Sequence, residues 1–220
     1  MRGRFITLEG PDGSGKSTQA QRLSEALRAI GRTVCLTREP GGTAVGERIR
    51  TVLLDIPDAR HTALTDALLF NAARAQLVAE VIEPALGRGE VVVCDRYADS
   101  TLAYQGAGGG VDRALLDGLQ RASTGGLLPD LTVLLDLPVE AGLRRRSRGP
   151  GVEWTRFEGG AGFDRDFHER VRARYLELAA GDPGRWRVVD ADRGADAVAA
   201  DVRAAVWSAL PAPAGDTDRG

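Results

Sequence analysis

The sequence predicts an α/β fold: a five-stranded parallel sheet with helices on both faces. Three of the five strand-like segments are nearly unbroken apolar runs, as expected for strands that are buried on both sides. Helical patterns separate all five strands, which is the alternation typical of a parallel sheet. The chain has 220 residues, of which 43% are hydrophobic and 27% are charged. That size and composition suit a globular domain with a sizeable core.

The five strands are expected where short apolar segments stand between helical patterns. The first, residues 4–9, leads into a cluster of glycines, and the second spans residues 33–37. The third and fourth, residues 90–95 and 131–136, are apolar runs that each end on an aspartate. The fifth spans residues 186–190.

The helices are expected where apolar residues recur at steps of three and four. In the first helix, Ala20, Leu23, Leu27 and Ile30 share one face, and Gly31 ends the helix. The expected ranges are about 15–30, 43–54, 63–86, 112–123, from 139 into an arginine-rich stretch, 164–180 and 195–210. No repeat or Pro/Ser-rich linker divides the chain, so we expect a single domain over residues 1–210. Residues 211–220, rich in Pro, Ala, Gly and Asp, are expected to form a disordered tail.

Charge and hydropathy exclude several classes of protein. With 29 basic and 31 acidic residues the net charge is −2, so a generally basic nucleic-acid coat is excluded and we expect no nucleic-acid partner. No apolar run approaches the roughly 20 residues of a membrane helix, and the N-terminus does not resemble a signal peptide. Cys35 and Cys94 lie in apolar strands and are expected to be small buried hydrophobes, which suits a cytoplasmic location.

A phosphate-binding loop is predicted between the first strand and the first helix. The segment matches G-x-x-x-x-G-K-[ST] in the strand–loop–helix context that this motif requires, so a chance glycine-rich turn is the minor alternative. Lys16 is the only lysine in the chain, and it supplies a compact charge to the terminal phosphates of a nucleotide, while Ser17 can hold Mg²⁺. The expected nucleotide-binding residues are Gly10, Pro11, Asp12, Gly13, Ser14, Gly15, Lys16, Ser17 and Thr18.

Asp95 and Arg96 follow the third strand, at the sheet edge where open parallel sheets bind ligands. In a P-loop NTPase fold an aspartate here reaches the metal or the attacking group, although a strand-end aspartate can also simply cap a turn. Arg96 can clamp a phosphate in bidentate fashion. No N-K-x-D element for guanine recognition is present, which disfavours a GTPase.

Phe70 and Arg74 lie one helical turn apart, where a ring and a guanidinium could stack on a base and bond to its edge. By composition alone, such a pair is more often a core aromatic beside a solvated arginine.

The sequence resembles the bacterial thymidylate kinases from about residue 4 to about residue 205. The stretches that carry the resemblance are residues 8–19, 37–43, 69–74, 95–106 and 172–179. The most specific is Asp95-Arg96-Tyr97 through Tyr104-Gln105-Gly106. The resemblance implies phosphoryl transfer from ATP to dTMP with Mg²⁺, giving ADP and dTDP for dTTP synthesis and DNA replication. The family is usually dimeric, so a homodimer is also implied.

The resemblance also implies roles for individual residues. Phe70 would stack on thymine, and Arg74 would bond to its exocyclic oxygen. Arg96 would hold the acceptor phosphate, Tyr104 would crowd the 2′ position of the sugar, and Asp12 would face the 3′-hydroxyl. The implied acceptor-site residues are Arg38, Phe70, Arg74, Arg96, Ser100, Thr101, Tyr104 and Gln105; the implied catalytic residues are Lys16, Asp12, Asp95, Arg96, Arg148 and Arg156; and the implied metal ligands are Ser17 and Asp95.

An arginine-rich lid is expected over residues 143–162. A solvated basic face or a nucleic-acid patch is the alternative for such a charge run. Position 13 is glycine and the loop holds no arginine, which in this family implies a catalytic arginine on the lid, with Arg148 and Arg156 as candidates. Gly109 and Thr155 depart from the arginine and aspartate that many bacterial members carry there.

Two other functions remain open at this point. One is a related kinase that phosphorylates another nucleoside monophosphate, such as dUMP, which lacks only the methyl group of thymine. The other is a nucleotide-binding switch that binds ATP without useful transfer.

Overall fold

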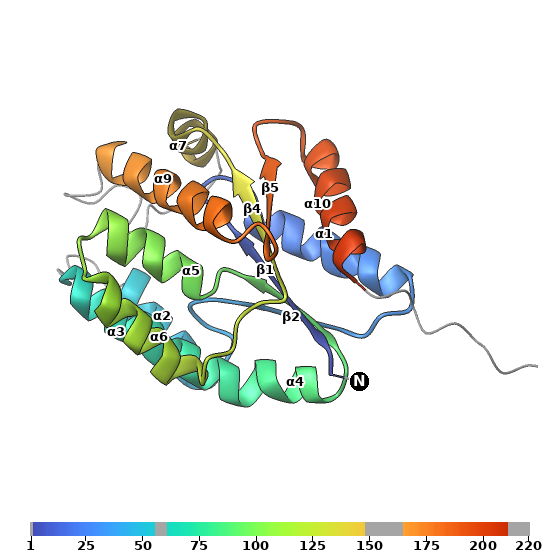
Figure 1. The fold of residues 1–220 in the computed structure, drawn as a ribbon, viewed down its shortest axis with the longest axis horizontal. Coiled ribbons are helices and arrows are strands. Elements are labelled where there is room, and N and C mark those ends of the chain that lie inside the picture. Colours follow the sequence, from blue (N-terminus) through green and yellow to red (C-terminus); the bar gives the residue numbers. More distant parts are fainter. Residues whose placement is uncertain (1, 56–60, 148–164, 211–220) are drawn as a thin grey trace, which may run out of the picture.

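The fold is organised around a five-stranded sheet in which every pair of neighbouring strands is parallel, in the order β2-β3-β1-β4-β5. The computed structural model describes residues 2–55, 61–147 and 165–210 (Figure 1). The strands are β1 (Arg4–Glu9), β2 (Val34–Arg38), β3 (Val91–Asp95), β4 (Leu131–Asp136) and β5 (Trp186–Asp190). The predicted α/β class and all five predicted strands are confirmed, with ends that shift by at most one residue.

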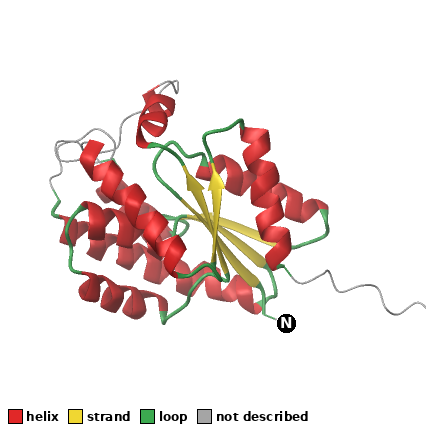
Figure 2. Ribbon diagram, turned by 45° about the horizontal axis from the view of Figure 1, so that its top comes forward, coloured by secondary structure: helices red, strands yellow, loops and turns green. Residues whose placement is uncertain are grey.

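Helices cover both faces of the sheet (Figures 1 and 2). The described helices are α1 (Lys16–Ala29), α2 (Ala44–Leu54), α3 (Ala63–Leu77), the π-helical η1 (Val78–Ile82), α4 (Glu83–Gly87), α5 (Ala98–Thr101), the π-helical η2 (Leu102–Gly108), α6 (Arg113–Thr124), α7 (Val139–Ser147), α9 (Arg165–Gly181) and α10 (Ala195–Ala209). The predicted helix over 63–86 is therefore α3, η1 and α4 in succession. No helix was predicted over α5 and η2, which follow β3 closely.

Alternating side chains of the strands divide the core between the two faces. Ile6 and Leu8 of β1 pack with α1 and α10, as do the alternate residues of β3 and β4. Phe5 points the other way, into a cluster with η1 and α4, and Leu134 of β4 packs with α9. Both sheet faces are thus covered, which explains why the strands read as continuous apolar runs. None of the helices within the described ranges combines the length and apolarity needed to span a bilayer.

The strand order brings two polar loops together. β1 lies between β3 and β4, and Leu8 is in register with Asp95. The loop that follows β1 and the Asp95–Arg96 pair that ends β3 therefore meet at the carboxyl edge of the sheet, where parallel sheets bind ligands.

Candidate functional site

The loop from Gly10 to Gly15 depends on glycine because other backbone atoms approach it closely. Gly10, Gly13 and Gly15 have φ values of 144°, 78° and 89°. A Cβ at Gly10 would lie 2.5 Å from the carbonyl oxygen of Leu135, and one at Gly13 would lie 2.5 Å from that of Gly142. Gly15 caps α1 with no side-chain hydrogen bond. The first N–H groups of this helix thus have no side-chain cap and can serve an anionic ligand.

Lys16 lies folded over this loop and is 7% exposed. Its Nζ donates to the carbonyl oxygen of Pro11 at 2.9 Å and to Ser14 Oγ at 3.4 Å. Burial, and then the charge of Arg96, lower the pKa of Lys16 to about 8, against the opposing pull of Asp12. The ammonium therefore still carries its charge at neutral pH.

Arg96 and Asp12 form an ion pair that joins the end of β3 to the loop. Tyr104 of η2 donates its hydroxyl to Asp12 Oδ2 at 2.8 Å, and the Arg96 guanidinium lies 5.0 Å from the centroid of the Tyr104 ring. Burial by itself would raise the pKa of Asp12, but Arg96, Lys16 and the Tyr104 hydrogen bond outweigh it and lower that pKa. Asp12 is thus held as a carboxylate.

The backbone at Arg96 is strained, with a φ of 72°, and no other non-glycine residue of the described segments has a positive φ. Residues held in this region cluster at functional sites because the surrounding structure must enforce them. Here Nη1 of Arg96 donates to the carbonyl oxygen of Gly10 at 3.2 Å, to Ser100 Oγ at 3.2 Å and to the Tyr175 hydroxyl at 3.3 Å. The guanidinium is therefore held at Nη2 by Asp12 and at Nη1 by these three acceptors.

Ser17 and Asp95 meet where a metal was predicted. Ser17 Oγ donates to Asp95 Oδ2 at 2.5 Å, which bridges the start of α1 and the end of β3. Within the described part of the chain, no three His, Cys, Asp or Glu side chains gather closely enough to form a metal cluster. One carboxylate and one hydroxyl nevertheless fit Mg²⁺, which keeps several waters and takes few protein ligands beside the phosphates of a substrate.

A cleft of about 440 Å³ opens between these groups and α3. Most of the predicted site residues line it, namely Asp12, Gly13, Gly15, Lys16, Ser17, Thr18, Arg38, Phe70, Asp95, Arg96, Ser100, Thr101, Tyr104 and Gln105. Gly10, Pro11 and Ser14 lie behind its surface, where they accept hydrogen bonds from Arg96 and Lys16. The cleft therefore joins the phosphate-binding loop and Arg96, which lie far apart in the sequence.

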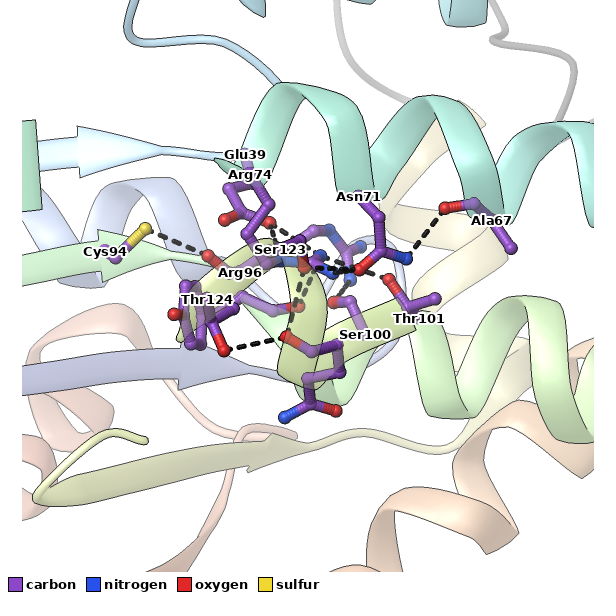
Figure 3. Close-up of polar contacts among 12 residues, drawn as sticks. Glu39, Ala67, Asn71, Arg74, Cys94, Arg96, Ser100, Thr101, Ser123 and Thr124 are labelled. Carbon is purple, nitrogen blue, oxygen red and sulfur yellow. Dashed lines mark hydrogen bonds and ion pairs between the residues drawn. The ribbon is translucent and has the colours of Figure 1, made fainter. Parts of the chain in front are cut away.

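Arg74 is 1% exposed and does not line this cleft. It forms a buried ion pair with Glu39 at 2.7 Å and donates to Asn71 Oδ1 at 3.3 Å and Thr101 Oγ1 at 3.1 Å (Figure 3). Two of these partners, Glu39 and Thr101, do line the cleft. Arg74 thus lies directly behind the wall that Phe70, Thr101 and Glu39 present.

Several residues of the site were missed from the sequence. Glu39, Pro40, Arg50, Leu54 and Arg145 also line the cleft. Glu39 and Pro40 follow β2 in a stretch that carries the resemblance, but no role was assigned to them, whereas Arg50 and Leu54 lie in α2, outside the stretches that carry it. Arg145 of α7 donates to the carbonyl oxygen of Ala191 at 2.9 Å, which ties the base of the expected lid to the loop after β5.

Part of the predicted site lies outside the described residues. Of the expected lid over 143–162, the structure describes residues 143–147 only. The candidate arginines Arg148 and Arg156 and the tail over 211–220 fall in the undescribed segments.

Comparison with known proteins identifies the family. The family model described as thymidylate kinase matches residues 8–202. The chain is 52% identical over 204 residues to the thymidylate kinase of Deinococcus radiodurans, covering 93% of this chain and 96% of that one. It is 53% identical over 206 residues to that of Thermomicrobium roseum, covering 94% and 93%. The crystal structure of thymidylate kinase from Ehrlichia chaffeensis superposes with a TM-score of 0.76 at 32% identity, covering 94% of this chain and 100% of that one. The resemblance drawn from the motifs is confirmed: the chain belongs to the thymidylate kinase family.

Proposed function

We propose that this protein transfers the γ-phosphoryl group of ATP to dTMP, giving ADP and dTDP, as a step in dTTP synthesis for DNA replication. The observation that carries the proposal is the single cleft lined by both Lys16 of the loop and Arg96 after β3. Two cationic groups that follow different strands, Lys16 after β1 and Arg96 after β3, can hold two phosphates facing each other. Phosphoryl transfer depends mainly on such positioning and charge neutralisation.

The acceptor binds on the α3 side of the cleft. Phe70 stacks on thymine, with Thr101 and Gln105 beside the base. Arg74 lies behind the wall of the cleft, so the second N–H of its Nη1, besides the one given to Asn71, bonds to the exocyclic oxygen once the side chains of that wall shift on binding. Tyr104 crowds the 2′ position of the sugar and Asp12 accepts from the 3′-hydroxyl. Arg96, Arg38 and Ser100 hold the acceptor phosphate.

The donor binds over the loop from Gly10 to Thr18. Lys16 holds the terminal phosphates of ATP, and Mg²⁺ held by Ser17 and Asp95 would neutralise phosphate charge when bound. The arginine-rich segment 143–162 serves as the lid, with Arg148 and Arg156 as the arginines that reach the transferred group. This machinery belongs to one domain over residues 1–210, which acts in the cytoplasm, where the thiols of Cys35 and Cys94 stay reduced.

The activity is tested by measuring ADP release with a panel of nucleoside monophosphates. We expect dTMP to be the best acceptor and dUMP to be poorer by about 10- to 200-fold in kcat/KM, because one methyl group contributes roughly 1–3 kcal/mol. Chelation of divalent metal should stop the reaction. ADP release that does not depend on an acceptor, or a clear preference for another monophosphate, would contradict the proposal.

We further propose that the protein is a homodimer that associates through α2, α3 and α6. These neighbouring helices expose apolar side chains at Val45, Val52, Leu64, Leu68 and Leu115, each between 37% and 49% exposed. Leu64 and Leu68 lie one turn apart on α3 and so share a face. Exposed apolar side chains on neighbouring helices are the kind of surface that a protein–protein interface would cover.

Replacing Leu64 and Leu68 with glutamate should dissociate the dimer, because four charges would be buried in a symmetric interface. Light scattering after size exclusion should show the mass fall from twice 23.4 kDa to 23.4 kDa. Leu128→Glu, at a leucine that is 55% exposed in the loop after α6, is the control and should leave the mass unchanged. A monomeric wild type would refute this assembly.

A further inference from the structure

Glu9, the last residue of β1, is a fully buried carboxylate that does not line the cleft. Three donors surround it. The backbone N–H of Tyr97 donates to Oε1 at 2.8 Å, and the hydroxyls of Ser100 and Tyr175 donate to Oε2 at 2.7 Å and 2.9 Å. These donors come from the loop after β3, from α5 and from α9, so Glu9 joins three separate elements beneath the cleft.

The two hydroxyls also contact Arg96. Its Nη1 donates to Ser100 Oγ at 3.2 Å and to the Tyr175 hydroxyl oxygen at 3.3 Å. Each hydroxyl has a single proton to give. The two hydroxyl oxygens also lie 2.8 Å apart, within donating distance of each other. When Glu9 is ionised it accepts both protons, and the lone pairs of both oxygens then face Arg96. By taking both protons, the ionised carboxylate orients the two hydroxyls so that their lone pairs accept from the guanidinium, which can only donate.

We propose that Glu9 is a positioning residue: its ionised carboxylate orients the Ser100 and Tyr175 hydroxyls as acceptors that aim Arg96 into the cleft. This inference rests on the proposed function, in which Arg96 holds the acceptor phosphate. A neutral Glu9 would have to donate a proton to one of the hydroxyls. That hydroxyl would give its own proton to the other hydroxyl, 2.8 Å away, so its oxygen would accept from Glu9 as well as from Arg96 and its alignment on the guanidinium would weaken.

The surroundings of Glu9 make this orientation sensitive to pH. Burial, followed by the negative charge of Asp99, raises the pKa of Glu9 to about 7, although Arg96, Ser100 and Tyr97 act to lower it. Other titratable groups that interact with Glu9 come from four elements: Lys16 on α1, Arg74 on α3, Cys94 on β3 and Tyr175 on α9. Asp99 is itself held by Arg185 at 2.6 Å. Because the raised pKa belongs to an acid, the ionised form is lost as the pH falls below about 7.

The test compares wild type with Glu9→Gln, which keeps the shape of the side chain and removes its charge. The readout is kcat/KM for dTMP at saturating ATP, measured from pH about 6 to about 8. The substrate phosphate and Lys16 titrate in both proteins, so the informative quantity is the ratio of wild type to variant. The ionised fraction of a group with a pKa near 7 rises about tenfold between pH about 6 and 8, so the ratio should rise with pH by up to about that factor.

A purely structural role for Glu9 would give a ratio that does not change with pH, and that result would overturn the inference. The double variant Glu9→Gln/Tyr175→Phe should lose less than the product of the two single losses, because both act through the same contact to Arg96. Independent, multiplicative losses would also count against it. Glu83→Gln, at a half-exposed glutamate of α4, is the matched control. Its ratio of wild type to variant should stay near one at every pH.

A second variant covers the case in which Glu9→Gln does not fold, and the activity of wild type tests the proposed function separately. If Glu9→Gln does not fold, as judged by thermal unfolding, the ratio of wild type to Tyr175→Phe should rise over the same pH range, and a constant ratio would overturn the inference. The proposed function fails separately, if wild type does not phosphorylate dTMP at all. Activity on dTMP with a pH-independent ratio would refute only the role of Glu9.

Discussion

Replacing Lys16 with alanine is expected to lower dTMP phosphorylation by at least about 10³-fold, or roughly 4 kcal/mol of transition-state stabilisation. Lys16 is buried in the loop, where water competes poorly for its charge. The alanine variant leaves the glycines and the start of α1 in place, so it removes the charge and little else. Coupled detection of ADP, together with direct detection of dTDP, measures the effect.

Lys16→Arg is the matched control because it keeps the charge and changes its shape. A planar guanidinium does not fit where Nζ contacts the Pro11 carbonyl oxygen at 2.9 Å, so this variant should also lose most of its activity. Robust dTDP production by either variant would show that the loop does not bind the transferred phosphate.

The second large effect is expected at Arg96. Replacing Arg96 with alanine should lower kcat/KM for dTMP by about 10²- to 10³-fold while ATP binding stays within a few-fold of wild type. The change removes the clamp on the acceptor phosphate, and it leaves the partly buried Asp12 carboxylate without its ion-pair partner. Steady-state kinetics for dTMP and equilibrium titration with an ATP analogue separate the two consequences.

Backbone strain provides the control for Arg96. Alanine at a φ of 72° costs about 1–2 kcal/mol, whereas glycine adopts this conformation readily. Arg96→Gly should therefore be the more stable of the two variants and equally impaired toward dTMP. Near-normal turnover in the glycine variant would mean that Arg96 matters only for the fold and would refute its role in acceptor binding.

The main features of the fold could be predicted because they depend on local patterns. Unbroken apolar strands alternating with amphipathic helices indicate a covered parallel sheet, and all five strands were found in this way. The helical segment from Ala98 to Gly108 was missed. Its second part is the π-helix η2, whose pairing does not follow the spacing of an ordinary helix. Tyr104 and Gln105 were nevertheless identified, through the resemblance of the surrounding stretch.

Part of the candidate site could also be predicted from local sequence patterns, and part could not. The phosphate-binding loop has a strong signature because glycine at fixed positions and a single lysine are needed for close backbone approach to a phosphate. Arg74 shows where a local argument is incomplete, because helical spacing placed it one turn from Phe70 but did not reveal its buried pair with Glu39. Glu9 gave no such signal, since one carboxylate at the end of a strand resembles a turn cap.

The sequence by itself determined the class of fold, the phosphate-binding loop, the family and the proposed reaction, because each rests on residues that are adjacent or regularly spaced. Only the tertiary structure decided which side chains share one cleft and what holds them there. Glu9, Arg96 and Tyr175 are far apart in the chain, and it is the strand order and the packing of α9 that bring them within hydrogen-bond distance. Such contacts depend on how whole elements pack, and no short stretch of sequence encodes them.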